Sequence, residues 1–330
     1  MNKVLDETSN NTKKNPDKTE ASKNLCVHDL RRRLKERQKK ANIRKVIILT
    51  IIIFFDKALN KLSKKHFRYY LYDYLRRSSY EKINVNGEML KLFTPSQIAK
   101  SRANRFFTKE PGTLKWIDSF SRFGNLDNFI FWDIGANVGL FSIYASTKHK
   151  NLKVFSFEPS TSNLVILSRN ISINKLSEKV IINQLALTDK DNQFLSLKEG
   201  HFEEGGALNT FGEEYNYEGR NFDEQNKYKI YGTSINYLIE KKILDIPNFI
   251  KIDVDGIEHL ILKGANRYLQ EEKIKSIQVE LNEGFEEQYI SADKILKDAK
   301  FILKSKVLAS SSGTKSKRFS QMLNCIYERE

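Results

Sequence analysis

The stretch that decides the fold is Phe129-Ile130-Phe131-Trp132-Asp133-Ile134-Gly135-Ala136-Asn137-Val138-Gly139-Leu140-Phe141. Residues 129–132 have the aromatic, β-favouring composition of a buried parallel strand, and residues 140–145 favour a helix. The intervening residues 135–139 should therefore form a strand-to-helix turn. Two glycines and an asparagine there tolerate positive φ, so the backbone can come close to a ligand. Such a turn is the usual ligand crevice of a doubly wound sheet.

Acids mark the ends of the first two predicted strands. Asp133 stands two residues before the first glycine of the turn, where a dinucleotide fingerprint needs no acid. A carboxylate there suits a ligand with an ammonium group, such as the amino-acid end of S-adenosylmethionine. Glu158 ends the strand over residues 153–157, about one βαβ unit later, and can accept hydrogen bonds from both ribose hydroxyls of an adenosyl ligand. The alternatives are a tight turn without a ligand and a solvated acid at a strand end.

The positive charge of the chain is concentrated near its N-terminus. The formal net charge is +15, and residues 1–79 hold 21 Lys and Arg against 8 Asp and Glu. Residues 1–24 are polar and should be disordered. Residues 25–80 should form a basic helical extension, and residues 81–330 a separate domain. Cys26 and Cys325 are too few for a disulfide framework, which favours a cytoplasmic location, and no sequence spacing typical of a metal site is present.

The extension contains a ten-residue apolar run, residues 46–55. A membrane-spanning helix needs about 20 apolar residues, so we do not expect this run to cross a bilayer. It can pack on the domain or on an oligomer partner. Alternatively, residues 30–65 can lie at the inner face of a membrane, with their cations facing anionic lipid. The tyrosines and cations that follow can also bind nucleic acid, which we consider less favoured.

The remaining elements alternate between strands and helices. An Asn-Gly pair predicts a hairpin over residues 83–93, and Thr113 is the predicted N-cap of a helix over residues 114–120. Residues 198–232 lack periodicity, so we expect a loop over the site rather than part of the sheet. Its acids would repel a phosphate backbone. The other predicted strands are 180–185, 249–256, 276–281 and an antiparallel pair, 301–303 with 323–327; the other predicted helices are 164–173, 235–240 and one starting at 258.

Six segments in order resemble the FkbM-type methyltransferase family. They are RANRFFTKEPGTLKWIDSF (102–120), WDIGANVGLFSIYA (132–145), VFSFEPSTSNLVILSRNISIN (154–174), ALTD (186–189), FIKIDVDGIEHLILKGA (249–265) and IQVELNE (277–283). The resemblance covers about residues 83–330. One departure is Asp255, since the family more often has Asp-Val-Glu-Gly at this motif.

The resemblance implies a class I methyltransferase that uses S-adenosylmethionine, usually to methylate hydroxyls of sugars, polysaccharides or natural products. It implies that Asp253 lies beside the transferring methyl group, as base or orienting acid, with Asp255, Glu280 and His259 as further candidates. The cofactor-binding residues that it implies are Glu110, Asp133, Gly135, Ala136, Asn137, Gly139, Glu158, Pro159, Ala186 and Asp253.

We therefore predict an α/β fold: a doubly wound, mostly parallel, seven-stranded sheet of the Rossmann-like class I methyltransferase type. No Asn-Pro-Pro-Tyr or Asp-Pro-Pro-Tyr segment and no cysteine at a strand tip occur, which disfavours methylation of amino groups and of cytosine C5. A small-molecule or glycan hydroxyl remains. The first rival is an RNA or DNA methyltransferase that grips the backbone through the extension, with strongly salt-dependent binding. The second is a catalytically idle membrane-surface or assembly module that does not bind the cofactor.

Overall fold

The computed structural model describes residues 43–44, 46–61, 66–125, 127–200, 202–309 and 320–329. The chain divides into two units, residues 1–78 and 79–330, which are described separately below. Residues 1–24, for which we predict disorder, lie outside the described ranges. Cys26 also lies outside them.

The described part of the first unit is helical. One helix covers the described residues between 43 and 61, and α2 spans Phe67–Ser78. The carboxylate of Asp56 accepts the backbone N–H of Arg68 at 2.9 Å, which satisfies one of the free donors in the first turn of α2. Over the residues that the structure describes, no helix combines the length and the hydropathy that a bilayer crossing requires.

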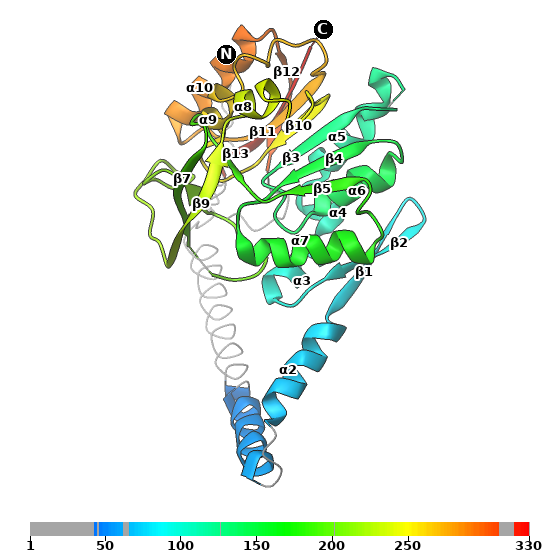
Figure 1. Ribbon diagram of the computed structural model, residues 1–330, viewed down its shortest axis with the longest axis vertical. Helices are drawn as coiled ribbons and strands as arrows, with labels where there is room; N and C mark the ends of the chain where they lie inside the picture. Colours follow the sequence, from blue (N-terminus) through cyan, green and yellow to red (C-terminus); the bar gives the residue numbers. More distant parts are fainter. Residues whose placement is uncertain are drawn as a thin grey trace, which may run out of the picture. The chain divides into compact units, whose positions relative to one another are not determined.

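The second unit is built on a seven-stranded sheet with the order β12-β13-β11-β10-β3-β4-β5 (Figure 1). Five adjacent strands, β11, β10, β3, β4 and β5, run parallel to one another. Strand β13 is antiparallel to both of its neighbours, β11 and β12. This confirms the predicted fold class, including the closing antiparallel pair. The strands are β3 (Ile130–Ile134), β4 (Lys153–Phe157), β5 (Val180–Asn183), β10 (Phe249–Ile252), β11 (Ser276–Asn282), β12 (Ile302–Leu308) and β13 (Met322–Glu328).

Helices cover both faces of this sheet (Figure 1), because alternate side chains of a buried strand point to opposite sides. Trp132 packs in the core on the side of α8 (Ile235–Glu240), α9 (Glu258–Lys263) and α10 (Glu286–Asp298). Phe131 packs on the side of α5 (Pro111–Asp118), α6 (Leu140–Lys148) and α7 (Thr161–Ile173). On that side the ring of Phe120 stacks on Phe249, with 3.7 Å between centroids. The site thus rests on a core buried from both faces.

The elements before β3 include the predicted hairpin, β1 (Tyr80–Val85) with β2 (Glu88–Phe93). Asn86 and Gly87 both have positive φ, which confirms the Asn-Gly turn. The prediction of Thr113 as N-cap is wrong: α5 begins at Pro111, with Glu110 as its N-cap residue, because proline fits the first turn of a helix. The remaining elements here are α3 (Gln97–Asn104), α4 (Phe106–Lys109) and a 3₁₀ helix, Ser119–Phe123.

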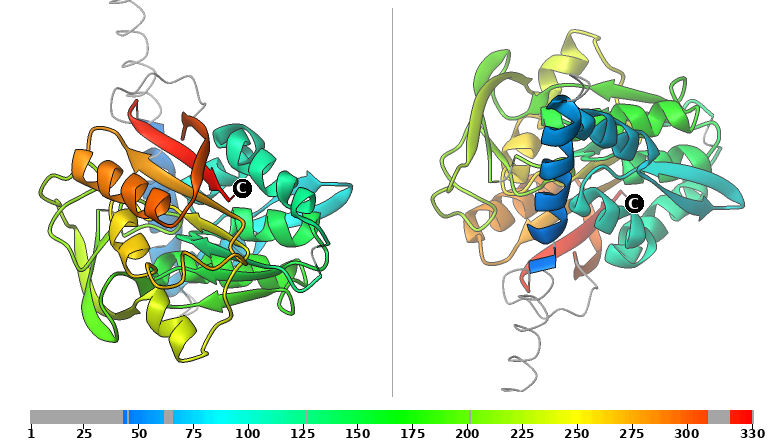
Figure 2. Two further views of the ribbon diagram at one scale, coloured as in Figure 1. Left: turned by 90° about the horizontal axis from the view of Figure 1, so that it is seen from above. Right: turned by 90° about the horizontal axis from the view of Figure 1, so that it is seen from below.

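A second, four-stranded sheet follows β5, with the order β6-β9-β7-β8. Its strands are β6 (Ala186–Leu187), β7 (Gln193–Glu199), β8 (Thr210–Phe211) and β9 (Asn226–Thr233), and β7 and β9 extend away from the main sheet (Figures 1 and 2). The prediction of one long loop over 198–232 is therefore wrong in part. Tyr228 and Ile230 alternate with exposed lysines, a period of two that their lysine-rich surroundings conceal.

Candidate active site

The glycine turn joins β3 to α6 as predicted. Gly135, Asn137 and Gly139 have φ values of 81°, 52° and 84°, a region that favours glycine and tolerates asparagine. A Cβ on Gly135 would lie 1.8 Å from the carbonyl oxygen of Asp253, and one on Gly139 would lie 2.4 Å from Leu167 Cδ1. Gly135 therefore allows two strand ends to meet, whereas Gly139 allows α6 and α7 to pack.

Glu158 lies at the end of β4 and is 4% exposed. It accepts the backbone N–H of Asn137 at 2.7 Å and that of Ser160 at 2.8 Å. Burial raises the pKa of Glu158 to about 7, although these donors act in the opposite direction. The carboxyl group therefore links the glycine turn to the start of α7 and can exchange a proton near neutral pH.

A small cavity of about 70 Å³ adjoins Glu158. Its wall includes five of the predicted cofactor residues besides Glu158: Gly135, Asn137, Pro159, Ala186 and Asp253. Asp255 also reaches it. Ala136 and Gly139 are not in this wall; the N–H of Ala136 is bonded to the carbonyl of Phe157 at 2.9 Å. The structure thus brings part of the predicted set together around one cavity.

Residues 204–208, which we call the strap, cross the site and are held by side chains from several elements. Asn137 Nδ2 donates to the carbonyl of Gly206 at 2.6 Å, and Asn163 Oδ1 accepts the N–H of Gly205 at 2.9 Å. Arg102 Nε donates to the carbonyl of Gly205 at 2.7 Å, and the carboxylate of Asp255 accepts the N–H of Leu208 at 2.6 Å. The strap is the part of residues 198–232 that forms a loop at the site, as predicted.

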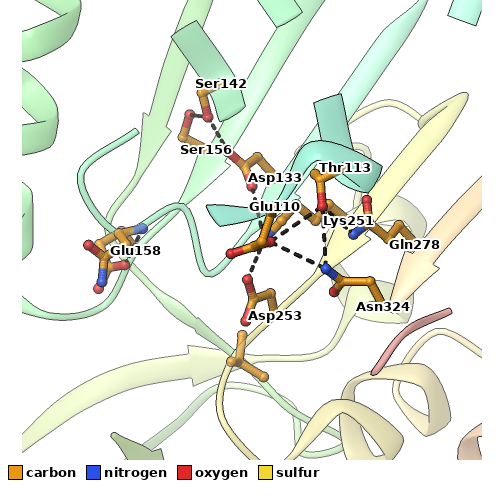
Figure 3. Close-up of polar contacts among 12 residues, drawn as sticks. Glu110, Thr113, Asp133, Ser142, Ser156, Glu158, Lys251, Asp253, Gln278 and Asn324 are labelled. Carbon is orange, nitrogen blue, oxygen red and sulfur yellow. Dashed lines mark hydrogen bonds and ion pairs between the residues drawn. The ribbon is translucent and has the colours of Figure 1, made fainter. Parts of the chain in front are cut away.

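A lysine is buried between two of the predicted acids. Lys251, in the middle of β10, is 1% exposed; its Nζ lies 2.7 Å from Asp253 Oδ2 and 4.0 Å from Asp133 Oδ1. Ser142 Oγ donates to Asp133 Oδ2 at 2.5 Å. Figure 3 shows Asp133, Lys251 and Asp253 gathered at the strand ends, with Glu158 standing apart. Asp133 is fully buried. It lines neither the small cavity at Glu158 nor the larger cavity that adjoins it. Its nearest cation in the described chain is the protein's own lysine.

The burial and spacing of Asp133, Lys251 and Asp253 determine the direction in which each pKa is shifted. Burial raises the pKa of Asp133, and Lys251 only partly offsets this effect. Burial also opposes ionisation of Asp253, but Lys251 and Lys109 outweigh it and hold the pKa of Asp253 below its usual range. Burial disfavours the charged form of Lys251, yet Asp253 and Asp133 raise its pKa above the ordinary value. Lys251 and Asp253 are therefore an ion pair at neutral pH.

Glu110 is buried beside this cluster and lines neither cavity. Its carboxylate accepts a hydrogen bond from Lys109 Nζ at 2.6 Å and one from Thr113 Oγ1 at 3.3 Å. Asn324 Nδ2 donates to it at 3.4 Å, and Figure 3 shows Thr113 and Asn324 beside Glu110. Glu110 thus connects the start of α5 to β13 directly behind the cavities.

Three acids lie close together in the wall of the site. One carboxylate oxygen each of Asp253, Asp255 and Glu280 lies within 4.8 Å of the others. Burial and the charge of Asp253 raise the pKa of Asp255 to about 6 and that of Glu280 well above its usual range. Such spacing could suit a divalent cation, but Lys251 already supplies a positive charge to Asp253. His259, the remaining candidate, lines neither cavity.

A second cavity, of about 1950 Å³, opens from the first. The two share Gly135, Asn137, Ala207, Asp253 and Asp255 in their walls, and Glu280 lines only the larger one. The site is therefore bipartite: a narrow part at Glu158 and a wide part beyond the acids.

Sequence reasoning missed the lysine of this site. Lys251 stands within the apolar strand Phe249–Ile252, two residues before Asp253, and residues two apart in a strand lie on one face. A charge in a strand buried on both faces needs a partner, and this was the available signal. Arg102 and the strap gave no comparable signal, because their approach to the site depends on the tertiary fold.

The known proteins that are similar to this chain include a methyltransferase family and individual methyltransferases. Residues 133–303, just over half of the chain, match the family model described as "Methyltransferase FkbM domain". The hexuronic acid methyltransferase AglP of Haloferax volcanii is 26% identical over 171 residues, which are 52% of this chain and 62% of that protein. Methyltransferase sdnD of Sordaria araneosa is 45% identical over 42 residues, 13% and 16% of the two chains. The match thus spans less than two thirds of the length of each of these relatives.

Solved structures with a similar arrangement include methyltransferases. Precorrin-6y C5,15-methyltransferase from Geobacter metallireducens is 15% identical, with a TM-score of 0.37 and coverage of 67% of this chain and 86% of that chain. TYW2 of M. jannaschii, solved in complex with AdoMet, is 13% identical, with a TM-score of 0.38 and coverage of 76% and 87%.

Proposed function

The chain belongs to the FkbM methyltransferase family, whose cofactor is S-adenosylmethionine, and we propose that the protein methylates a hydroxyl group of a sugar or glycan. The observation that carries the proposal is the set of three acids in the larger cavity, two of which, Asp253 and Asp255, also line the smaller one. One cavity has an acid suited to a ribose, and the other has room for an acceptor. The acids stand where the two ligands would meet.

The residues present fit the cofactor. Gly135 has no space for a Cβ, so the backbone is bare at the junction of the cavities. Buried Asn137 Oδ1 has no hydrogen-bond partner in the described chain, so it is available to a donor on a ligand. Glu158 would hold the ribose hydroxyls, with Pro159 and Ala186 in the wall beside it. Asp133 and Glu110 would not line the cofactor site. Asp133 would hold Lys251 in place, and Glu110 would hold the start of α5 in place.

The acids Asp253, Asp255 and Glu280 can have different roles in methyl transfer. When bound, S-adenosylmethionine supplies a methyl group that is activated by its sulfonium sulfur. Asp253, kept ionised by Lys251, would orient the acceptor hydroxyl. Asp255, whose pKa is about 6, is suited to take the hydroxyl proton near neutral pH as the C–O bond forms and the S–C bond breaks. Glu280, whose pKa burial and the charge of Asp253 raise well above its usual range, lies beside Asp253 in the wall of the larger cavity.

A sugar acceptor has two lines of support. AglP, a partial relative, is named as a methyltransferase of a hexuronic acid. The larger cavity, about 1950 Å³, also exceeds what a drug-sized ligand usually occupies and has room for more than one sugar ring. The cytoplasmic location and the absence of a resident metal remain predictions.

The test is transfer of a radiolabelled methyl group from S-adenosylmethionine by the full chain to three acceptors: a neutral glucan, a uronic-acid polysaccharide and total RNA. We expect label in a glycan, and we expect it to survive mild alkali, because a methyl ether resists hydrolysis that removes a methyl ester. Asp255→Asn should abolish the signal, and Asp189→Asn, an acid outside both cavities, should retain it. Alkali-labile label or label only in RNA would contradict a hydroxyl acceptor on a sugar.

A further inference from the structure

Cations line the larger cavity in excess of its acids. They come from the helical side, α3 to the 3₁₀ helix, and from β12, and they are Arg102, Arg105, Lys109, Lys115, Arg122 and Lys304. The acids in the same wall are Asp253, Asp255, Glu280 and Glu328. Two of these acids are already paired, Asp253 with Lys251 and Glu328 with Arg122. The excess of positive charge is therefore available to a ligand.

Arg102 is the cation best placed to meet an acceptor near the reacting acids. Arg102 lies in the wall of the larger cavity, and it is bonded to the strap, whose Ala207 lines both cavities. The strap fixes its Nε through the carbonyl of Gly205, and neither of its Nη nitrogens has a hydrogen-bond partner within the described ranges. Such a guanidinium edge matches a carboxylate or a phosphate in two parallel hydrogen bonds.

Lys115 adds a second charge farther along the wall. Its exposed side chain has no ion pair or hydrogen bond to any residue that the structure describes. A large cavity with a fixed arginine and a free lysine on one wall would favour an anionic ligand over a neutral one of the same size.

We propose that the acceptor is an acidic sugar, whose carboxylate or phosphate is bound by the Nη nitrogens of Arg102 next to the hydroxyl that is methylated. The proposal rests on the proposed function and specifies its substrate class. Lys115 strengthens the selection for negative charge without contacting the reacting atoms.

The experiment measures binding of glucuronate, glucose 1-phosphate and glucose to the full chain saturated with S-adenosylhomocysteine, by calorimetry at constant ionic strength. We expect at least one acid to bind tenfold or more tightly than glucose. The acid that binds more tightly identifies the group as carboxylate or phosphate. Arg102→Gln should remove most of this preference and Arg102→Lys should restore part of it, because lysine keeps the charge but not the paired geometry.

Two further variants separate recognition from folding. Lys115→Gln leaves the strap contact untouched and should reduce the preference severalfold. Arg267→Gln, in which the lost cation lies outside both cavities and pairs with Glu240, should keep it. Equal binding of the three probes, no binding of any, or equal losses in the Arg267 variant would overturn the proposal. Methylation of neutral glycans without any preference would overturn it while leaving hydroxyl methylation standing.

An independent observation concerns the helix of the first unit. Its apolar side chains are exposed at consecutive positions, so they surround the helix and do not form one stripe: Val46 61%, Ile47 52%, Ile48 57%, Leu49 56%, Ile51 49%, Ile53 51%, Phe54 69% and Phe55 54% exposed. The cations Arg44, Lys57, Lys61, Arg68, Arg76 and Arg77 outnumber the two acids, Asp56 and Asp73, in the described part of this unit.

We infer that this surface, residues 46–61, binds the headgroup region of an anionic bilayer. The apolar run is about 15 Å long as a helix, half of the hydrocarbon thickness, so it can enter the interface without crossing. The cations in the described part of this unit complement anionic lipid, whereas they would repel those of a second copy of the chain.

The test is flotation of the full chain with vesicles of phosphatidylcholine alone or with one quarter phosphatidylglycerol. We expect flotation with the anionic vesicles, lost in the double variant Ile47→Asp with Phe54→Asp and retained in Ile290→Asp, whose side chain is equally exposed at 54% but lies on α10. Equal flotation with neutral vesicles would overturn the inference. So would a stable dimer in light scattering without flotation.

Discussion

The two cavities of the site are built in different ways. The one at Glu158 is about 70 Å³, it lies at the ends of β3 and β4, and backbone N–H groups there hold the carboxylate of Glu158 in place. The other is about 1950 Å³, and side chains from helices and from β12 and β13 line it. A wall held by backbone geometry leaves little freedom in what it binds, whereas a wall of side chains can change its ligand by substitution. We therefore expect the narrow cavity to determine cofactor affinity and the wide cavity to determine acceptor choice.

The largest effect should come from the acid at the junction. Asp255→Asn should lower kcat by roughly 10²- to 10⁴-fold, the range for loss of a general base, because an amide cannot take the hydroxyl proton. Binding of S-adenosylhomocysteine should change less than about threefold, a small free-energy difference. The measurements are initial rates and calorimetry on the same preparation. A loss of cofactor affinity as large as the loss of kcat would show that Asp255 acts in cofactor binding and would contradict its role as the base.

The next effect is on stability and affects both cavities. Lys251→Met leaves Asp253 and Asp133 without their buried cation, and removing one partner of such a pair typically costs about 3–5 kcal/mol. We expect the free energy of unfolding in urea to fall by that order. The double variant with Asp253→Asn should recover a large part, because it removes the acid left unpaired. A single variant as stable as the wild type would show that the lysine is not needed to neutralise the cluster.

The fold could be predicted from sequence because its signals are local. The strands from β3 to β5 are mostly apolar, and the turn at residues 135–139 contains the residue types that positive φ favours. The narrow cavity inherits that predictability, since Gly135 and Glu158 are adjacent to these strand ends. Backbone direction alone brings them together.

The wide cavity could not be predicted in the same way. Asp253, Asp255 and Glu280 were candidates because the family resemblance implies them, but the ionised state of Asp253 depends on a lysine buried two residues away. The strap meets Asn137 and Arg102 through backbone carbonyls, and a carbonyl belongs to every residue type. Contacts of this kind carry no sequence signal, so only the tertiary structure reveals them.

A smaller effect tests the narrow cavity. Glu158→Ala should weaken binding of S-adenosylhomocysteine by roughly 5- to 150-fold, which corresponds to the 1–3 kcal/mol lost when buried donors are left unpaired. The N–H groups of Asn137 and Ser160 are those donors. Glu199→Ala is the matched control, because Glu199 is also buried and hydrogen-bonded but lines neither cavity. Equal losses in the two variants would indicate a general effect on folding.

The smallest effect is a proton released when the cofactor product binds. The pKa of Glu158 is about 7 in the free protein, so about half of the molecules hold its proton at pH 7. Ribose hydroxyls donate only to an acceptor, which favours the ionised carboxylate and lowers its pKa in the complex. Binding of S-adenosylhomocysteine at pH 7 should therefore release about 0.5 proton, and the release should fall toward zero at pH 9.

This release is measured by calorimetry in two buffers that differ in ionisation enthalpy, and Glu158→Gln should abolish it.

The raised pKa of Glu158 also affects the stability of the free protein. The native state holds a proton that the unfolded chain gives up above its ordinary value of 4.5, so this carboxyl stabilises the fold below that pH and its contribution is lost as the pH rises to about 7. Cofactor binding should thus raise the melting temperature more at pH 8 than at pH 5. Proton uptake on binding, or a larger thermal shift at pH 5, would mean that the ligand prefers the protonated acid and that Glu158 does not face the ribose.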